Sequence, residues 1–162
     1  MSFKLIVKKS ESIKGALVFG LFDAIAAYIL GEFSIIRLLG MSLMGATFYA
    51  TEIPSFFAWI EHKSQSMKAW HGKLYKTLMT AVYFNPLWVA RHMCLIYLLN
   101  RQSFGWEVMN TAWLSFWYGL PVSLLANYVI QNHIVMKYRF LASAIFSGCM
   151  VVFYAVSAVY FK

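Results

Sequence analysis

Residues 111–130 read TAWLSFWYGLPVSLLANYVI and decide the fold class of this chain. The stretch contains no formally charged residue, and about 20 predominantly apolar residues are enough for a helix to cross ~30 Å of hydrocarbon. It also contains Pro121, and a proline removes one backbone hydrogen bond from a helix. In a membrane the freed carbonyl must be satisfied by neighbouring helices, polar side chains or a wet cavity. The stretch therefore predicts a membrane-spanning helix that borders a polar interior.

Four other apolar stretches of similar length make the chain polytopic. With Thr111–Ile130, the predicted spans are Gly15–Phe33, Ile35–Ile60, Leu74–Leu99 and Phe140–Phe161. Pro54 and Pro86 lie in the second and third spans. We expect an all-α transmembrane helix bundle, a single domain over residues 1–162, with its second to fourth helices kinked by proline. The first stretch is short and contains Asp23, so four spans plus one membrane-embedded segment is the alternative.

Composition and charge support the same class. Of 162 residues 61% are hydrophobic and 12% charged, against roughly 45–50% and about 25% in soluble domains. The net charge of +8 is unevenly distributed, because nine lysines and arginines fall on one predicted face and three on the other. The nine are Lys4, Lys8, Lys9, Lys14, Lys63, Lys68, Lys73, Lys137 and Arg139. This asymmetry predicts an N-terminus on the inner face of a bacterial inner membrane or of an organelle membrane, mitochondrial inner or peroxisomal, and argues against nucleic-acid binding.

Four polar residues inside the predicted spans are candidates for a solute or ion pathway: Asp23, Glu52, Arg91 and Asn127. An ionisable group at membrane depth costs at least about 2.5–3.5 kcal/mol, so it normally has a partner or a water-filled path. The carboxylates would bind a cation, a proton or an amine, and Arg91 an anionic group. The alternative is that the charged groups form interhelical pairs that fix packing. For Asn127 an interhelical hydrogen bond is the expected structural role.

Counting residues along each span also predicts how deep these groups lie. At 1.5 Å per residue, Asp23 and Glu52 lie about 12 Å from the basic face, whereas Arg37 and Arg91 fall in the opposite half. Carboxylates and arginines would then form separate layers. Arg37 and Lys76 are expected to extend toward the membrane interfaces, and Lys76 with Glu52 is an example of an interhelical pair.

No catalytic or metal-binding pattern is evident. His62, His71 and His133 lack metal-ligand spacing, and Cys94 and Cys149 are isolated. No nucleophile and base stand together in a known motif. We therefore expect neither an enzyme nor a bound metal or cofactor.

Several of these features occur in the order seen in a known family. The pieces are Gly20-Leu21-Phe22-Asp23; Arg37, Gly45, Pro54 and Trp59; Lys76, Phe84 and Pro86; Trp117-Tyr118, Pro121 and Leu125-Ala126-Asn127-Tyr128; and Tyr138-Arg139. The chain thus resembles the Mpv-seventeen, or peroxisomal-membrane-channel, family over nearly its whole length. The resemblance implies a small-solute channel of an organelle membrane.

A narrower resemblance covers about twenty residues. Trp70, Leu74, Leu78 and Phe84-Asn85-Pro86 are similar to one span of bacterial L-alanine exporters. The predicted function is therefore a membrane pore or carrier for small solutes, with an exporter of small amino acids as one alternative. A non-transporting assembly factor or complex subunit is the other. Expected partners are membrane lipids and a small solute, and a homo-oligomer is allowed.

Overall fold

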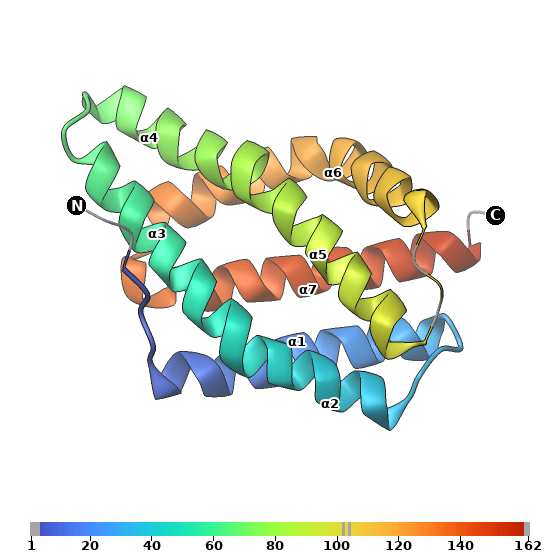
Figure 1. The fold of residues 1–162 in the computed structure, drawn as a ribbon. Coiled ribbons are helices and arrows are strands. Elements are labelled where there is room, and N and C mark those ends of the chain that lie inside the picture. The colour runs from blue at the N-terminus through green and yellow to red at the C-terminus, as the bar shows by residue number, and fades with distance from the viewer. Residues whose placement is uncertain (1–3, 102, 104, 161–162) are drawn as a thin grey trace. The chain divides into compact units, whose positions relative to one another are not determined.

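The computed structural model describes residues 4–101, 103 and 105–160, with no account of the side chains of 157–160. Helix is the only regular secondary structure in this part of the chain, and it forms five continuous segments (Figure 1). They are α1 (Lys9–Ile29); α2 (Ile35–Met44), continued by η1 (Gly45–Tyr49) and α3 (Ala50–Ser64); α4 (Ala69–Leu78), continued by η2 (Met79–Phe84) and α5 (Asn85–Leu99); α6 (Trp106–His133); and α7 (Met136–Tyr160). The prediction of an all-α chain is confirmed.

Each of the five helical segments overlaps one of the five predicted apolar stretches, but the first and last residues mostly differ from those predicted. Helix α1 begins at Lys9 and ends at Ile29, earlier at both ends than predicted. Gly31 stops it with a φ of 72°, and the next amide, of Glu32, donates to the Ala27 carbonyl at 2.8 Å. A residue in this left-handed conformation is a common helix terminator. Two stretches, Lys9–Ile29 and Met136–Val156, are long and apolar enough to cross a membrane, judged by length and composition.

The prolines lie inside or at the start of helices, and two of them follow a π-helical turn. Turn η1 ends at Tyr49, shortly before Pro54 in α3, and η2 ends at Phe84, two residues before Pro86 in α5. Pro86 cannot donate to the carbonyl four residues earlier, and that carbonyl lies in η2, where hydrogen bonds reach one residue further than in an α-helix. Helix α6 continues across Pro121 without such a turn. The predicted proline kinks stay a prediction.

The helices divide into two compact units, one formed by residues up to Phe57 together with those from Met136 onward. In this first unit α1 packs against α2, η1 and α7. Glycines allow the close approach: a Cβ on Gly15 would meet the backbone of Gly45, and one on Gly148 would meet the ring of Phe22. The rings of Phe19 and Tyr49 pack between α1 and η1 with centroids 4.7 Å apart.

The second unit spans Ala58–Val135 and centres on α6. Helix α6 packs against α4, η2 and α5. Buried apolar side chains from α6 and η2 contribute to its core, among them Ala81, Phe84, Val108, Ala112 and Phe116.

Large apolar side chains remain exposed along the helices of both units. On α1, Leu17, Leu21 and Ile25 recur every four residues and are all exposed. Only 33% of the apolar window of α1 and 28% of that of α7 is buried by the rest of the protein. The core helix of a soluble protein would be mostly buried, and apolar surface of this extent normally marks contact with another apolar phase.

The glycine contact between α1 and η1 yields a test by thermal unfolding in detergent. Gly15→Ala and Gly45→Ala should each destabilise the protein by about 1–3 kcal/mol, since the new methyl group meets backbone that cannot move aside. Gly105→Ala is the comparison variant, because a Cβ there meets the flexible side chain of Glu107 at 3.3 Å; as the N-cap of α6 it should cost about 1 kcal/mol or less. Equal stability of all three variants would contradict the packing described.

Candidate functional site

A buried charge cluster lies in the first unit, where α1 is joined to α2. Ser34 caps α2 by accepting a hydrogen bond from the Arg37 amide at 3.1 Å, which fixes where the helix begins. Arg37 then lies in the first turn of α2, and its side chain reaches Asp23 on α1 and Glu32 in the connecting turn. The turn at Gly31 and the cap at Ser34 together place all three charged groups in one cluster.

The geometry of the cluster is that of a closed ion pair. The Arg37 Nε and Nη2 atoms donate to the two carboxylate oxygens of Asp23 at 2.9 and 3.0 Å, and Nη1 donates to Glu32 at 3.0 Å. The side chains of Arg37 and Asp23 are each 2% exposed, whereas that of Glu32 is 41% exposed. A bidentate arginine–carboxylate pair satisfies both partners. Asp23 thus forms an interhelical ion pair, which was the alternative to a role in a solute pathway.

Two expectations about this region are wrong. Arg37 does not extend to an interface, because its side chain is buried against Asp23. Asp23 and Arg37 also do not lie in separate layers, because they are hydrogen-bonded. The depth estimate failed because it was counted from Gly15 to Phe33. Since α1 ends at Ile29, Asp23 lies nearer the C-terminal end of its helix than predicted.

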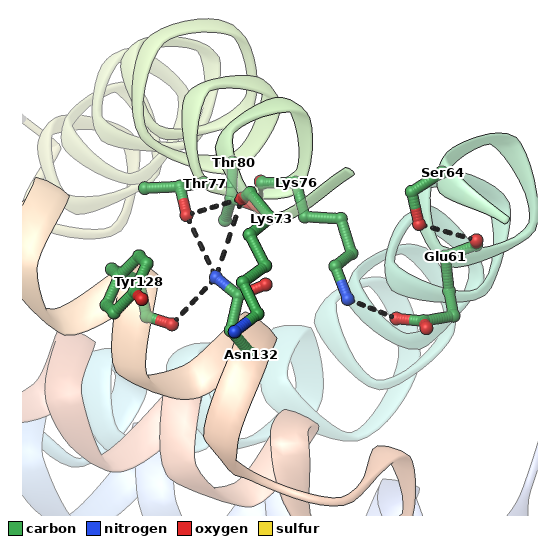
Figure 2. Close-up of polar contacts among 8 residues, drawn as sticks. All are labelled: Glu61, Ser64, Lys73, Lys76, Thr77, Thr80, Tyr128 and Asn132. Carbon is green, nitrogen blue, oxygen red and sulfur yellow. Dashed lines mark hydrogen bonds and ion pairs between the residues drawn. The ribbon is translucent and has the colours of Figure 1, made fainter. Parts of the chain in front are cut away.

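In the second unit a polar cluster joins α3, α4 and α6, as Figure 2 shows. Lys76 on α4 pairs with Glu61 on α3 at 3.1 Å, and not with Glu52 as the sequence suggested. Asn132 near the end of α6 donates to the Thr77 hydroxyl at 3.2 Å and to the Tyr128 carbonyl at 3.0 Å. Helix α3 extends beyond the predicted span end at Ile60, and this extension brings Glu61 within reach of Lys76.

Next to Asn132 in the chain is Gln131, the most unusual polar residue of this unit. Its side chain is fully buried, with 0% exposed. Neither its amide nitrogen nor its amide oxygen has a hydrogen-bond partner among the described residues. Burial of an amide without compensation costs roughly 1–3 kcal/mol on protein mutational scales, and such groups usually have a partner or a bound polar molecule.

Gln131 was not among the residues predicted from the sequence, because the fourth span was expected to end at Ile130, whereas α6 continues to His133. The available signal was spacing: Ser123, Asn127 and Gln131 recur every four residues and so lie on one side of a helix.

The four predicted pathway residues are distributed over both units. Asp23 and Glu52 belong to the first, and Arg91 and Asn127 to the second. Glu52 is partly buried in the first turn of α3, and Arg91 is partly buried in α5. Asn127 is buried, and it donates to the Ser123 carbonyl of its own helix at 2.8 Å. That bond lies within α6, so the hydrogen bond described for Asn127 is not the expected interhelical one.

Among the described residues, no group of three or more His, Cys, Asp or Glu side chains is placed to hold a metal ion. Comparison of the chain with protein-family models, curated proteins and solved structures gave no match.

The Asp23–Arg37 pair predicts a strong and asymmetric mutational response. Arg37→Leu alone and Asp23→Leu alone should each destabilise the protein by about 3–5 kcal/mol, because the first leaves the buried Asp23 carboxylate without Arg37 and the second leaves Arg37 only its contact with the partly exposed Glu32. The double Leu variant should recover most of that loss. Glu32→Gln is the control, with an effect of about 1 kcal/mol or less, since Glu32 is partly exposed. Chemical unfolding in detergent micelles measures all four, and additive losses in the double variant would contradict the pairing.

Proposed function

We propose that this chain is an integral membrane pore or carrier for small polar solutes. The membrane part of the proposal is supported by helices that are apolar yet largely uncovered by protein. The windows of α1 and α7 are 33% and 28% buried. Hydrocarbon is the environment in which such faces are stable, and it also requires that backbone hydrogen bonds be made within helices.

Five spans follow if the composite helices also cross the bilayer. Helices α2 to α3 and α4 to α5 are each continuous over more than the ~20 residues that a span requires. Helix α6 is 28 residues long and free of formal charge from Thr111 to Ile130. The lysine and arginine asymmetry places the N-terminus inside, in a bacterial inner membrane or an organelle membrane.

The observation that carries the transport proposal is the Gln131 amide. The side chain is fully buried, so bulk water does not compensate its amide, and a polar molecule is the natural partner for its donor and its acceptor. Asn127 lies one turn earlier on α6 and is buried as well. A small solute with both donors and acceptors, such as a polyol or a zwitterionic amino acid, has the matching chemistry. Glu52 and Arg91 remain proposed as charged side chains along the solute pathway.

In this proposal Asp23 has a different role from the one first expected. Its carboxylate is occupied by Arg37, so it holds α1 to α2 and does not contact the solute. The resemblance to Mpv-seventeen channels favours a pore with a size limit, and the resemblance to L-alanine exporters favours a carrier for a small amino acid.

A second candidate is a non-transporting assembly factor or complex subunit. The observation that favours it is closure of the charged groups into pairs, Asp23 with Arg37 and Lys76 with Glu61. A protein that uses its buried charges only for packing needs no solute path. Gln131 separates the two candidates, because it is not part of either pair.

The test is solute efflux from liposomes that contain the purified protein, with sugars of graded size and L-alanine. Wild-type protein should release solute, and Gln131→Leu should lower the rate about tenfold or more. The same substitution should leave thermal stability unchanged or raise it, because an apolar side chain of similar size removes an uncompensated buried amide.

Gln65→Leu is the matched control, because Gln65 is exposed in the turn between α3 and α4, and its efflux should equal that of wild type. Efflux with a size limit supports a pore, and efflux of L-alanine alone supports an exporter. Efflux that is unchanged in Gln131→Leu contradicts the assigned site, and no efflux from wild-type protein favours the assembly-factor candidate.

A further inference from the structure

The turn between α3 and α4 presents a surface of one charge sign. Lys63, Lys68 and Lys73 are all exposed, and residues 62–75 include no aspartate or glutamate. The nearest acidic residue on α3, Glu61, is paired with Lys76 at 3.1 Å. Lys76 offsets the charge of Glu61, so along this part of the sequence that carboxylate does not compensate the three exposed lysines. We name these three lysines, with Trp70, the α3–α4 basic surface.

Helix α4 continues from this surface as an apolar stripe. Trp70, Leu74 and Leu78 recur every four residues, so they share one side of the helix. Their exposed fractions are 64%, 43% and 41%. Lys73 is one residue from Leu74, so cationic and apolar groups are fixed next to each other on a rigid element.

The order of groups along this segment matches the layers of a membrane leaflet. Lys63 and Lys68 come first, the exposed Trp70 follows, and Lys73 lies next to Leu74, where the exposed aliphatic side chains of α4 begin. Tryptophan is enriched at the headgroup level, and lysines near the cytoplasmic surface attract anionic lipids. We infer that the α3–α4 basic surface binds the headgroups of anionic phospholipids, with acyl chains along Trp70, Leu74 and Leu78.

This inference rests on the membrane insertion in the proposed function and not on transport. A soluble acidic protein would match the lysines, but the apolar stripe beside them has the chemistry of an acyl chain. The N-terminal lysines differ in their setting. Lys4 and Lys8 precede α1 and are outside any helix, and Lys14 is paired with Glu11 at 2.9 Å. They can add general attraction to an anionic leaflet, but Lys4 and Lys8 are not fixed on a helix, and the charge of Lys14 is offset by Glu11. Lys9 opens α1 and is followed at four-residue spacing by exposed Ile13 and Leu17, but no tryptophan lies between them.

The experiment measures lipid selection by the full chain. The protein is reconstituted in nanodiscs with equal amounts of phosphatidylglycerol and phosphatidylcholine, and native mass spectrometry gives the ratio of the two lipids that stay bound. Wild-type protein should retain phosphatidylglycerol preferentially. The triple variant Lys63→Gln, Lys68→Gln, Lys73→Gln should lower that preference at least about fivefold, because each lysine near an anionic surface contributes to binding.

Two matched variants make the result specific. The corresponding triple lysine-to-arginine variant should keep the preference, because the charges are retained. Lys4→Gln, Lys8→Gln, Lys14→Gln loses the same net charge elsewhere and should also keep it. An unchanged preference in the first glutamine variant, or an equal loss in both glutamine variants, would overturn the inference.

Failure of the proposed function gives a different signal. A chain that is extracted from membranes by alkaline carbonate is not integral, and insertion is then wrong for wild type and variants alike. A chain that resists extraction but binds both lipids equally retains its membrane location and lacks the proposed surface. Solute efflux is measured separately and decides neither result.

Discussion

Hydrogen bonding of the backbone within helices is the constraint on which this structure depends. The helices expose apolar faces over much of their length, and a backbone amide or carbonyl on such a face has no water to bond in hydrocarbon. Helix is the only regular structure in the described part of the chain, which is the structure that the proposed membrane location requires. The same constraint fits the π turn before Pro86, because the carbonyl four residues before that proline lies in η2. At the start of α2 the Ser34 side chain accepts a hydrogen bond from the Arg37 amide.

Polar side chains meet the constraint in two ways. Buried hydroxyls such as those of Thr77 and Thr80 donate to carbonyls of their own helix, and charged groups are paired, as in the bidentate Arg37–Asp23 pair and the Lys76–Glu61 pair. Such pairs join consecutive helices, since their cost is offset only when both partners are present. Gln131 differs, because its amide is buried and lacks a described partner. If every buried polar group had a partner within the protein, a bound solute would not be needed to satisfy any of them. Burial of the Gln131 amide has a cost, and binding of a polar solute would offset that cost.

The sequence predicted the elements of this fold better than their contacts. Apolar length alone located five helical segments, because hydrophobic stretches of this length are distinctive. Contacts depended on where each helix ends, and those ends are set by turns. Gly31 ended α1 early and brought Asp23 beside Arg37, and the extension of α3 past Ile60 gave Lys76 the partner Glu61. Gln131 was missed because α6 continues one turn beyond the predicted span.

The measurement that tests the account most directly is the sidedness of single cysteines in a chain without Cys94 and Cys149. Cysteines replace Phe33, Ser66, Ser103 and Val135, one in each turn between the five helical segments, and an impermeant thiol reagent is applied to intact cells and to inverted vesicles. Five spans predict labelling of positions 66 and 135 from the inside and of positions 33 and 103 from the outside. Labelling of positions 66 and 103 from the same side would contradict the account, because the helical segment from α4 to α5 would then not cross the membrane.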